Sequence, residues 1–589
     1  MFFDLESVLL LGVIIFLILA LYKEIFHPAA VFFIAVAILI IFGILTPEQA
    51  LAGFSNVQIA TIILLLIVSN VIQKTGIMRF YFAKILKKDM SYSSFLGRMF
   101  LVVSSASSFL NNTPIVAMFI PYVYNWAKAK NVAPSKVLIP LSYAAILGGT
   151  ITLIGTSTNL IVNGFMIENG FKPFNIFDFA YVGIPATIAG FLYMVFIGKN
   201  LLPRREDAVE KFLERKTDYF VETIVDKNSF LIGKTIKEAK LRNLEGLFLA
   251  EIIRKEEKIS PVKPTEIIKE GDLLIFVGNT DSIYNLINQN IGISLPKEHI
   301  IKSEYLELVE IVISYNSSLI NQKVKDTDFR GKYDATIIAI HRNGEKLSGK
   351  IGDIVLKPGD LLLVLAGEDF FKRAEDTTDF YIVSKYKEIS KIDKKKGNFV
   401  FWGFLTVIVL SALKIIPLFV GLILLIASFV LFKIGRYSDI KKGLDINLVV
   451  IAALSLAIGK AMLVTGTADL LASIINSSLQ PLGLFGALLG IYLITNILTE
   501  FVTNIAAASI TFPIAISSAS VYSVEPTAFA LAVAYGASAS FVTPIGYQTN
   551  LMVYAIGNYK FKDFVKVGLP LSIIYGIICL TVLYFLFLA

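Results

Sequence analysis

Long apolar runs constrain the fold of this chain more than any other feature. Continuous stretches of about 18 or more apolar residues are typical of membrane-spanning helices, because a helix of that length crosses the hydrocarbon layer. Two sets of five such runs flank a charged segment at about 203–396: 5–22, 27–44, 55–73, 137–165 and 180–198, then 398–413, 415–432, 446–464, 527–556 and 567–588. The sequence therefore predicts two membrane-embedded halves around a soluble insert.

The composition agrees with a membrane protein and excludes several alternatives. Hydrophobic residues make up 55% of the 589 residues and the mean hydropathy is +0.71, which is too apolar for a soluble chain of this size. The single cysteine, Cys579, excludes disulfides and thiolate metal clusters within one chain. The first apolar run follows acidic residues and lacks a small-residue cleavage site, so it is expected to be a retained span and not a signal peptide.

The two apolar halves repeat each other at an offset of about 390 residues. "NTPIVAMFIP" at 112–121 aligns with "NIAAASITFP" at 504–513, and "IGTSTNL" at 154–160 aligns with "IGYQTNL" at 545–551. Paired halves with polar interruptions at matching positions are typical of secondary transporters that bind substrate near the middle of the membrane.

Each half also contains one interrupted element, at about 93–126 and 482–519, whose path decides the topology. If these elements cross the membrane, the two repeats are parallel; if they are re-entrant hairpins, the repeats are inverted. The re-entrant arrangement places 23 Lys and Arg residues on one side and only Lys172, Lys414 and Lys460 on the other. Because cytoplasmic loops are enriched in Lys and Arg, this arrangement is favoured, with a cytoplasmic insert and both termini outside. The net charge of +8 thus follows topology, and nucleic acid is not an expected partner.

Polar residues mark the tips of both expected hairpins. The first tip has Asn111, Asn112 and Thr113, and the second has Thr503 and Asn504. A turn buried in hydrocarbon leaves backbone groups unpaired, so it survives only where protein encloses it or where it lines a polar cavity. Neutral oxygens suit a hard cation such as Na⁺, whereas free N–H groups at helix starts favour an anion. The sequence therefore predicts a joint anion and cation site.

A second interrupted stretch in each half, at 148–159 and 536–550, has the same chemistry. Glycines, together with Pro544 in the second copy, break these stretches, and Ser, Thr, Asn and Gln residues supply oxygens. Glu500 lies beside the second hairpin tip at membrane depth. Because a carboxylate within the membrane is costly, Glu500 is a functional candidate.

These motifs resemble those of the divalent anion:sodium symporter (DASS) family, within the ion transporter superfamily, over nearly the whole chain. That family has a Ser-Asn-Thr motif at each hairpin tip. Here the tips read Asn111-Asn112-Thr113 and Thr503-Asn504-Ile505, so the second lacks its last hydroxyl. The stretch "TPIGYQTNLMVY" at 543–554 is similar to the sulfate-permease-like branch. The resemblance implies a sodium-coupled symporter that imports a small divalent anion, most simply sulfate, by an elevator mechanism.

The resemblance also implies roles for single residues. Na⁺ is the implied coupling ion, with no other metal and no organic cofactor. The implied assembly is a homodimer among the lipids of a prokaryotic inner membrane. The implied substrate ligands are Asn112, Thr113, Ser157, Asn504, Thr543 and Pro544. The implied sodium ligands are Ser108, Asn111, Asn112, Gly155, Asn159, Thr499, Thr503, Asn504, Val542 and Asn550.

The soluble insert contains a second repeat, with an offset of 88 residues between "NSFLIGKTIKE" at 228–238 and "NSSLINQKVKD" at 316–326. Alternating apolar residues and turn signals such as "GD" predict two small α+β modules. They resemble TrkA-C domains (the C-terminal domains of regulator-of-K⁺-conductance proteins), which implies dimerisation and binding of a small regulatory ligand.

The expected fold is therefore a polytopic α-helical membrane protein. It has two inverted repeats of five spans plus one re-entrant hairpin each, and two TrkA-C-like domains are inserted between them. The expected boundaries are 1–202 for membrane repeat 1, 203–295 and 296–396 for the two soluble domains, and 397–589 for membrane repeat 2.

Other functions remain open at this point. The chain could transport a dicarboxylate or another oxyanion, or could be a proton-coupled antiporter in which Glu500 is essential. It could also be a nutrient sensor that binds its ligand without transporting it. An enzyme is not expected, because the membrane segments contain no His or Asp pair of catalytic or metal-binding spacing.

Overall fold

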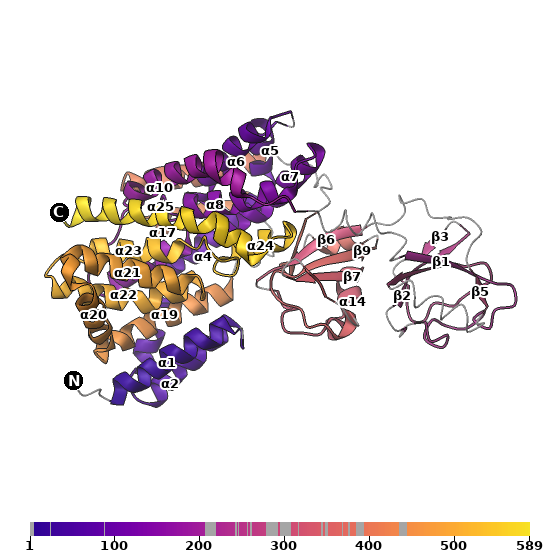
Figure 1. The fold of residues 1–589 in the computed structure, drawn as a ribbon, viewed down its shortest axis with the longest axis horizontal. Helices are drawn as coiled ribbons and strands as arrows, with labels where there is room; N and C mark the ends of the chain where they lie inside the picture. Colours follow the sequence, from indigo (N-terminus) through magenta and orange to yellow (C-terminus); the bar gives the residue numbers. More distant parts are fainter. Residues whose placement is uncertain are drawn as a thin grey trace.

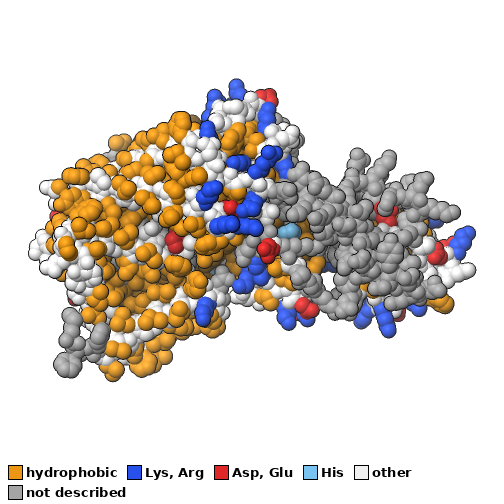
Figure 2. Space-filling model, viewed as in Figure 1, with side chains coloured by type: hydrophobic (Ala, Val, Ile, Leu, Met, Phe, Trp, Pro, Cys, Tyr) orange, Lys and Arg blue, Asp and Glu red, His pale blue; other side chains and the backbone are white. Residues whose placement is uncertain are grey.

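The computed structural model describes a helical body joined to two β-sheets (Figure 1). In Figure 2, apolar side chains cover the visible helical surface, and Lys and Arg gather at the end that faces the sheets. The described residues are 5–23, 25–87, 89–205, 220–241, 244, 247–255, 257–259, 262–278, 292–294, 308–315, 317–342, 345–347, 351–367, 369–374, 377–383, 394–434 and 445–589.

The helical body is built from the two apolar halves of the chain. Within the described part, seven helices are long and apolar enough to cross a membrane. The principal helices of the first half are α1 (Leu5–Tyr22), α2 (Pro28–Ile41), α4 (Val57–Thr75), α5 (Ile77–Ile85), α6 (Tyr92–Ser107), α7 (Asn112–Ala129), α8 (Leu138–Gly149), α9 (Ser157–Glu168) and α10 (Ala180–Leu192). Those of the second half are α16 (Lys394–Ala412), α17 (Leu418–Leu431), α19 (Ile446–Val464), α20 (Thr467–Ser478), α21 (Gly483–Thr499), α22 (Asn504–Val521), α23 (Thr527–Ser538), α24 (Gln548–Ile556) and α25 (Phe561–Phe587).

The long apolar runs at 137–165 and 527–556 are not continuous helices. Each is divided by an irregular segment, at 150–156 between α8 and α9 and at 539–547 between α23 and α24. We call these the first and second broken segments. Gly155 shows why the chain can bend at the first broken segment. A Cβ on this residue would lie 2.5 Å from the Gly149 carbonyl oxygen, so only glycine lets the two backbone stretches come this close.

The prolines that follow the hairpin tips lie within helices and do not end them. The first turn lies at 108–111, between α6 and α7, and Pro114 already belongs to the first turn of α7. Proline is tolerated there because the first N–H groups of a helix have no partner within the helix. Pro121 and Pro513 lie inside α7 and α22.

The two halves pack into one shared core. α9 contacts both α4 of its own half and α22 of the other half, where the Phe165 and Phe512 rings stack at 4.9 Å. Tyr143 donates a hydrogen bond across the halves to the Phe541 carbonyl at 2.6 Å, and Tyr535 donates to the Phe179 carbonyl at 2.7 Å. Small buried residues along α22 and α23 let helices approach closely, as is common inside membrane bundles.

The insert forms two sheets with the same all-antiparallel order. The first contains β1 (Phe220–Val225), β2 (Leu247–Arg254), β3 (Glu257–Ile259), β4 (Leu273–Gly278) and β5 (Ile293–Ser294), in the order β3-β2-β4-β1-β5. The second contains β6 (Leu308–Ile313), β7 (Ala335–Arg342), β8 (Glu345–Lys346), β9 (Leu361–Ala366) and β10 (Phe380–Ile382), in the equivalent order β8-β7-β9-β6-β10. We call the parts around these sheets the first and second modules.

The two modules contain the same ion pair at positions 88 residues apart in the sequence. Arg254 pairs with Asp272 in the first module, and Arg342 pairs with Asp360 in the second, with nitrogen–oxygen distances of 2.8 and 2.7 Å. Each aspartate follows a glycine with positive φ, which forms the turn before the next strand. The soluble insert is thus strand-rich, as expected, while its assignment to the TrkA-C type stays a prediction.

Candidate functional site

Two matching asparagines hold the broken segments in shape. Asn159 Nδ2 lies 3.4 Å from the Gly149 carbonyl oxygen and 2.9 Å from that of Thr152. Asn550 Nδ2 lies 2.8 Å from the Ser540 carbonyl oxygen and 3.2 Å from that of Thr543. Because both asparagines are fully buried, they satisfy backbone groups that no water can reach. Each is therefore part of the framework of its broken segment.

The hairpin tips repeat a second pair of contacts. Ser107 donates to Asn112 Oδ1 at 2.5 Å, and the Thr499 hydroxyl lies 2.9 Å from Asn504 Oδ1. The tips also bind the broken segments of their own halves: Thr152 donates to the Ser108 carbonyl, and Thr543 donates to the Glu500 carbonyl at 3.0 Å.

The two halves meet at Tyr547, in the second broken segment. Asn112 Nδ2 donates to the Tyr547 hydroxyl at 2.5 Å, and that hydroxyl lies 3.4 Å from Thr156 Oγ1. Beside it, Thr113 donates to Gln548 Oε1 at 3.0 Å. The first hairpin tip is thus joined to the other half through hydroxyl and amide groups, which can hold an oxyanion or a hydrated ion.

Glu500 makes the second tip chemically different from the first. Its carboxylate is buried, and its two oxygens accept hydrogen bonds from the backbone N–H groups of Val542 at 2.9 Å and Thr543 at 2.8 Å. The residue at the equivalent position of the first tip is Ser108, whose hydroxyl instead donates to Ser104 of its own helix. The second tip therefore carries a carboxyl group that is held directly on its broken segment.

Some buried oxygens in these segments could coordinate a cation. Asn159 Oδ1 and Ser540 Oγ are buried and have no hydrogen-bond partner among the described residues. A Cβ on Gly546 would lie 2.1 Å from Ser540 Oγ and 2.9 Å from the Thr499 carbonyl oxygen, so these oxygens crowd around this glycine. Within the described part of the chain, no cluster of three His, Cys, Asp or Glu residues could hold a metal. The donor set consists of neutral oxygens with one carboxylate, which suits Na⁺ better than a transition metal.

The expected site residues are brought together in part. Asn112 and Thr113 lie at the junction of the halves, while Asn504, Thr499, Thr543 and Val542 surround the second tip. Thr503 caps α22, with its hydroxyl 3.3 Å from the Ala506 N–H, and Ser157 begins α9. Pro544 lies in the second broken segment. Among the described contacts, no hydrogen bond links Asn112 directly with Asn504.

Sequence reasoning did not select Tyr547, and it named Gln548 only as one oxygen donor of the second interrupted stretch and not as a substrate ligand. Tyr547 aligns with Thr156 and Gln548 aligns with Ser157 in the two copies of the "IG" motif. The substitution of a large phenol for a small hydroxyl at one of two equivalent positions is the signal that could have drawn attention to this pair.

A cavity of about 180 Å³ adjoins the first hairpin tip. We call it the tip cavity. Its lining includes Asn111 and Thr113 from the tip, Gln548 from α24, Gln73 from α4, and Leu448 of α19 with Asp445 just before that helix. Residues of the second module line another side.

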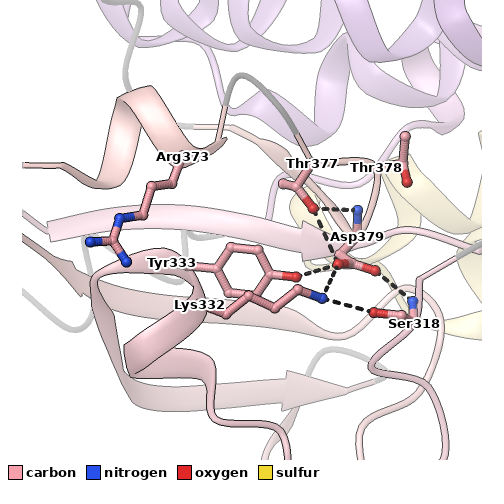
Figure 3. A pocket seen from close by; sticks show the side chains of 7 residues that line it. All are labelled: Ser318, Lys332, Tyr333, Arg373, Thr377, Thr378 and Asp379. Carbon is pink, nitrogen blue, oxygen red and sulfur yellow. Dashed lines mark hydrogen bonds and ion pairs between the residues drawn. The ribbon is translucent and has the colours of Figure 1, made fainter. Parts of the chain in front are cut away.

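A second hollow, of about 450 Å³, lies in the second module, and we call it the Asp379 cleft (Figure 3). Lys332 and Tyr333 point toward Asp379, whereas Arg373 points away from it. Burial alone would raise the pKa of Asp379. Hydrogen bonds from Tyr333, Lys332 and the Ser318 N–H outweigh it and hold the pKa well below its usual range.

Comparisons with known proteins identify the family. The citrate transporter family model matches residues 14–534. The chain belongs to this family. An uncharacterized transporter of Synechocystis is 32% identical over 97% of this chain and 95% of its own length. A Chlamydomonas reinhardtii protein named, provisionally, as a sulfur deprivation response regulator is 34% identical over 94% of this chain and 97% of its own. Sodium/sulfate cotransporter 1 of the same alga is 24% identical over 93% of this chain and 86% of its own.

The protein is accordingly a transporter-family membrane protein, and this membership indicates a transporter and not an enzyme. The matched region runs from within α1 to within α23, so it includes most of the first half, the insert, and the second half as far as α23. The comparisons do not assign a substrate or a coupling ion to this chain's own residues.

Proposed function

We propose that this member of the citrate transporter family is a sodium-coupled symporter that imports a small divalent anion, preferably sulfate. The observation that carries the proposal is the pair of matching tip contacts, Ser107–Asn112 and Thr499–Asn504, each beside a broken segment. The relatives named as sodium/sulfate cotransporters support this substrate and this coupling ion.

The anion would bind where the first tip meets the second half. Asn112, Thr113, Tyr547 and Gln548 offer amide and hydroxyl groups there, and α7 and α24 both begin at this point. Helix starts favour anions because their first N–H groups are unpaired and the helix dipole is positive at that end. Ser157, Asn504, Thr543 and Pro544 complete the proposed set.

Two sodium ions would bind at the junctions between the tips and the broken segments. In the first half the candidates are Ser108, Asn111, Asn112, Gly155 and Asn159. In the second half they are Thr499, Thr503, Asn504, Val542 and Asn550, with the Glu500 carboxylate close by. The buried oxygens of Asn159 and Ser540, for which the described part of the chain supplies no hydrogen-bond partner, support cation binding at both places.

The proposed movement is an elevator in a homodimer with inverted repeats and a cytoplasmic insert. The concentration of Lys and Arg at the end of the helical body near the modules supports this orientation (Figure 2). A small ligand on the TrkA-C-like modules would regulate transport.

The test is uptake of labelled sulfate by the purified protein in liposomes. Uptake is expected with an inward Na⁺ gradient and not with a matched K⁺ gradient. Asn112→Ala and Asn504→Ala are each expected to abolish it. Asn200→Ala, which removes an exposed amide outside the site, is the control and should leave uptake unchanged. Uptake that ignores Na⁺ would refute the coupling, and normal uptake by both site variants would refute the site.

A second candidate function is favoured by one observation. The relative named as a sulfur deprivation response regulator has 34% identity and nearly full coverage of both chains. The chain could therefore act as a sensor whose membrane part binds the anion without carrying it. Sulfate-dependent thermal stabilisation without any flux in liposomes would support the sensor and exclude the symporter.

A further inference from the structure

Residues of the second module line part of the tip cavity. On one side the cavity is lined by Asn111, Thr113 and Gln548, which belong to the proposed site; on the other it is lined by Tyr315, Thr378 and Tyr381 of the module. At about 180 Å³ the cavity is smaller than the roughly 300–1,000 Å³ typical of sites for drug-sized ligands, so it suits a small ion. Figure 1 shows the module's strands β6 and β9 next to α24.

Apolar packing fixes the module against the helices. Val312, Leu361 and Val383 of the module are buried in the same hydrophobic cluster as the helices, and not in the module's own core. The turn at Gly359 lies directly on α24, because a Cβ on this glycine would be 2.7 Å from Leu551 Cγ. Tyr124 of α7 also donates a hydrogen bond to Glu310 of β6 at 3.2 Å. The second module is therefore packed against the helical core and is not a loosely tethered domain.

We propose that the second module forms one wall of the tip cavity and closes the proposed anion site on the side that faces the module. The anion would then pass on that side only when the module moves. The inference rests on the proposed function and adds Tyr315, Thr378 and Tyr381 to the residues along the anion's route. Burial, with a contribution from nearby Asp445, raises the pKa of Tyr381 to about 12. Tyr381 therefore keeps its proton at neutral pH and can donate a hydrogen bond to an anion in the cavity.

The Asp379 cleft lies directly behind this wall. Thr378 lines both the cleft and the tip cavity, and its carbonyl accepts a hydrogen bond from Ser314 at 2.5 Å. Asp379 holds the same stretch by accepting from the Ser318 N–H at 2.5 Å and from Lys332 at 3.0 Å (Figure 3). The position and stiffness of the wall thus depend on the Asp379 network.

Among the described residues of the first module, no equivalent of the Asp379 network is present. The strand pairing places Gly292 where the second module has Asp379, because Ile293 pairs with Val225 as Phe380 pairs with Ile313. A Cβ on Gly292 would lie 2.4 Å from Ser229 Cα, so no carboxylate fits at that position. The Asp379 network therefore belongs to the module that lines the tip cavity. This is expected if the network holds the cavity wall in position.

The experiment measures how accessible the cavity is to a thiol reagent. Leu448 lines the cavity but is not among the proposed ligands, so a Leu448→Cys substitution in a Cys579→Ala background reports on opening. A bulky, charged maleimide should label the detergent-solubilised full chain slowly. Glu310→Ala, which breaks the contact with Tyr124, and Asp379→Asn should each accelerate labelling about fivefold or more, the lower end of typical coupling between sites. Asp353→Ala is the matched control, because it removes a carboxylate that forms an exposed ion pair with Lys325 in the same module and is not part of the cavity lining.

The outcomes separate this inference from the proposed function. Two results would refute the inference that the second module closes the tip cavity. One is equally fast labelling in all variants, and the other is no acceleration in a Glu310→Ala protein whose thermal stability is normal. In liposomes, Tyr381→Phe should raise the KM for sulfate without changing the labelling rate; an unchanged KM would remove Tyr381 from the route. If no variant carries sulfate, the symporter proposal fails while the labelling still decides whether the module closes the cavity.

Discussion

The two halves of the helical body share their framework contacts and differ in the groups around them. Asn159 and Asn550 make the same pair of backbone hydrogen bonds, and Thr152 and Thr543 each bind the carbonyl of the neighbouring tip. The differences lie between these contacts: Ser108 against Glu500, Thr113 against Ile505, Thr156 against Tyr547, and Ser157 against Gln548.

This comparison separates the contacts that both halves need to bend the chain from the residues that make the two halves of the site different. A contact that is required to bend the chain within a membrane must be present in both halves, because each half has an interrupted helix whose backbone must be satisfied. The substituted positions are free of that requirement. They make the otherwise symmetric site unequal, with a carboxylate at one tip and a phenol at the centre.

The largest effects are expected from the shared asparagines. Asn550→Ala removes the side-chain donor from the buried Ser540 and Thr543 carbonyls. Asn159→Ala removes it from the Gly149 and Thr152 carbonyls, of which the Thr152 carbonyl keeps the Gly155 N–H at 3.3 Å. Each group left unpaired costs roughly 1–3 kcal/mol. Both variants should lower the thermal stability and reduce sulfate uptake more than about tenfold, which corresponds to ~1.4 kcal/mol. Asn169→Ala, which removes a single bond to the Phe165 carbonyl at a helix end, is the control. A large loss in only one of the two variants would show that their roles are not equivalent.

The next effect concerns the carboxylate present at one tip only. Glu500→Gln preserves size but replaces two charge-assisted hydrogen bonds, which are worth about 1.5–3 kcal/mol each. We expect the Na⁺ concentration for half-maximal uptake to rise about tenfold or more, whereas Asn200→Ala, at an exposed position outside the proposed site, should change it little. The measurement is sulfate uptake as a function of Na⁺ and of pH. Unchanged Na⁺ dependence with lost pH dependence would instead favour a proton-coupled antiporter.

A smaller effect is expected at the phenol. Tyr547→Phe removes a hydroxyl that contacts Asn112 and Thr156, and a neutral hydrogen bond contributes about 0.5–1.5 kcal/mol. The KM for sulfate should rise about two- to tenfold at similar stability. Tyr535→Phe, whose hydroxyl bonds the Phe179 carbonyl away from the site, should lower stability and leave the KM unchanged. Equal KM values for the two variants would assign Tyr547 a structural role.

Much of this architecture is readable from the sequence because polar residues are conspicuous in apolar runs. Asn112, Asn159, Asn504 and Asn550 stand out in this way, and the glycines mark where the helices break. The spacing of 88 residues likewise predicts two similar modules. The family membership agrees with the transporter expectation, while the assigned ligands and domain boundaries stay predictions.

The remaining features depend on long-range packing, which no local pattern reports. Tyr547 looks like an ordinary aromatic residue until its hydroxyl reaches Asn112, 435 residues earlier in the chain. Pro114 looks like a helix breaker, but it occupies a helix start where its missing N–H has no cost. The wall formed by Tyr315, Thr378 and Tyr381 depends on how the second module docks, and strand periodicity does not determine that.

The smallest effect, on selectivity, sharpens the comparison at the anion site. Gln548→Ser gives the start of α24 the residue that the start of α9 has at Ser157, and it releases Thr113 from its 3.0 Å contact. The shorter side chain enlarges the space beside the tip, so larger anions should be accepted better. We expect dicarboxylates to compete with labelled sulfate more strongly, by less than about tenfold, since pocket size alone gives modest discrimination. The reciprocal Ser157→Gln should weaken competition by the same anions if both segments face the substrate. If Gln548→Ser leaves the competition profile of wild type unchanged, Gln548 positions the first tip and does not select the anion.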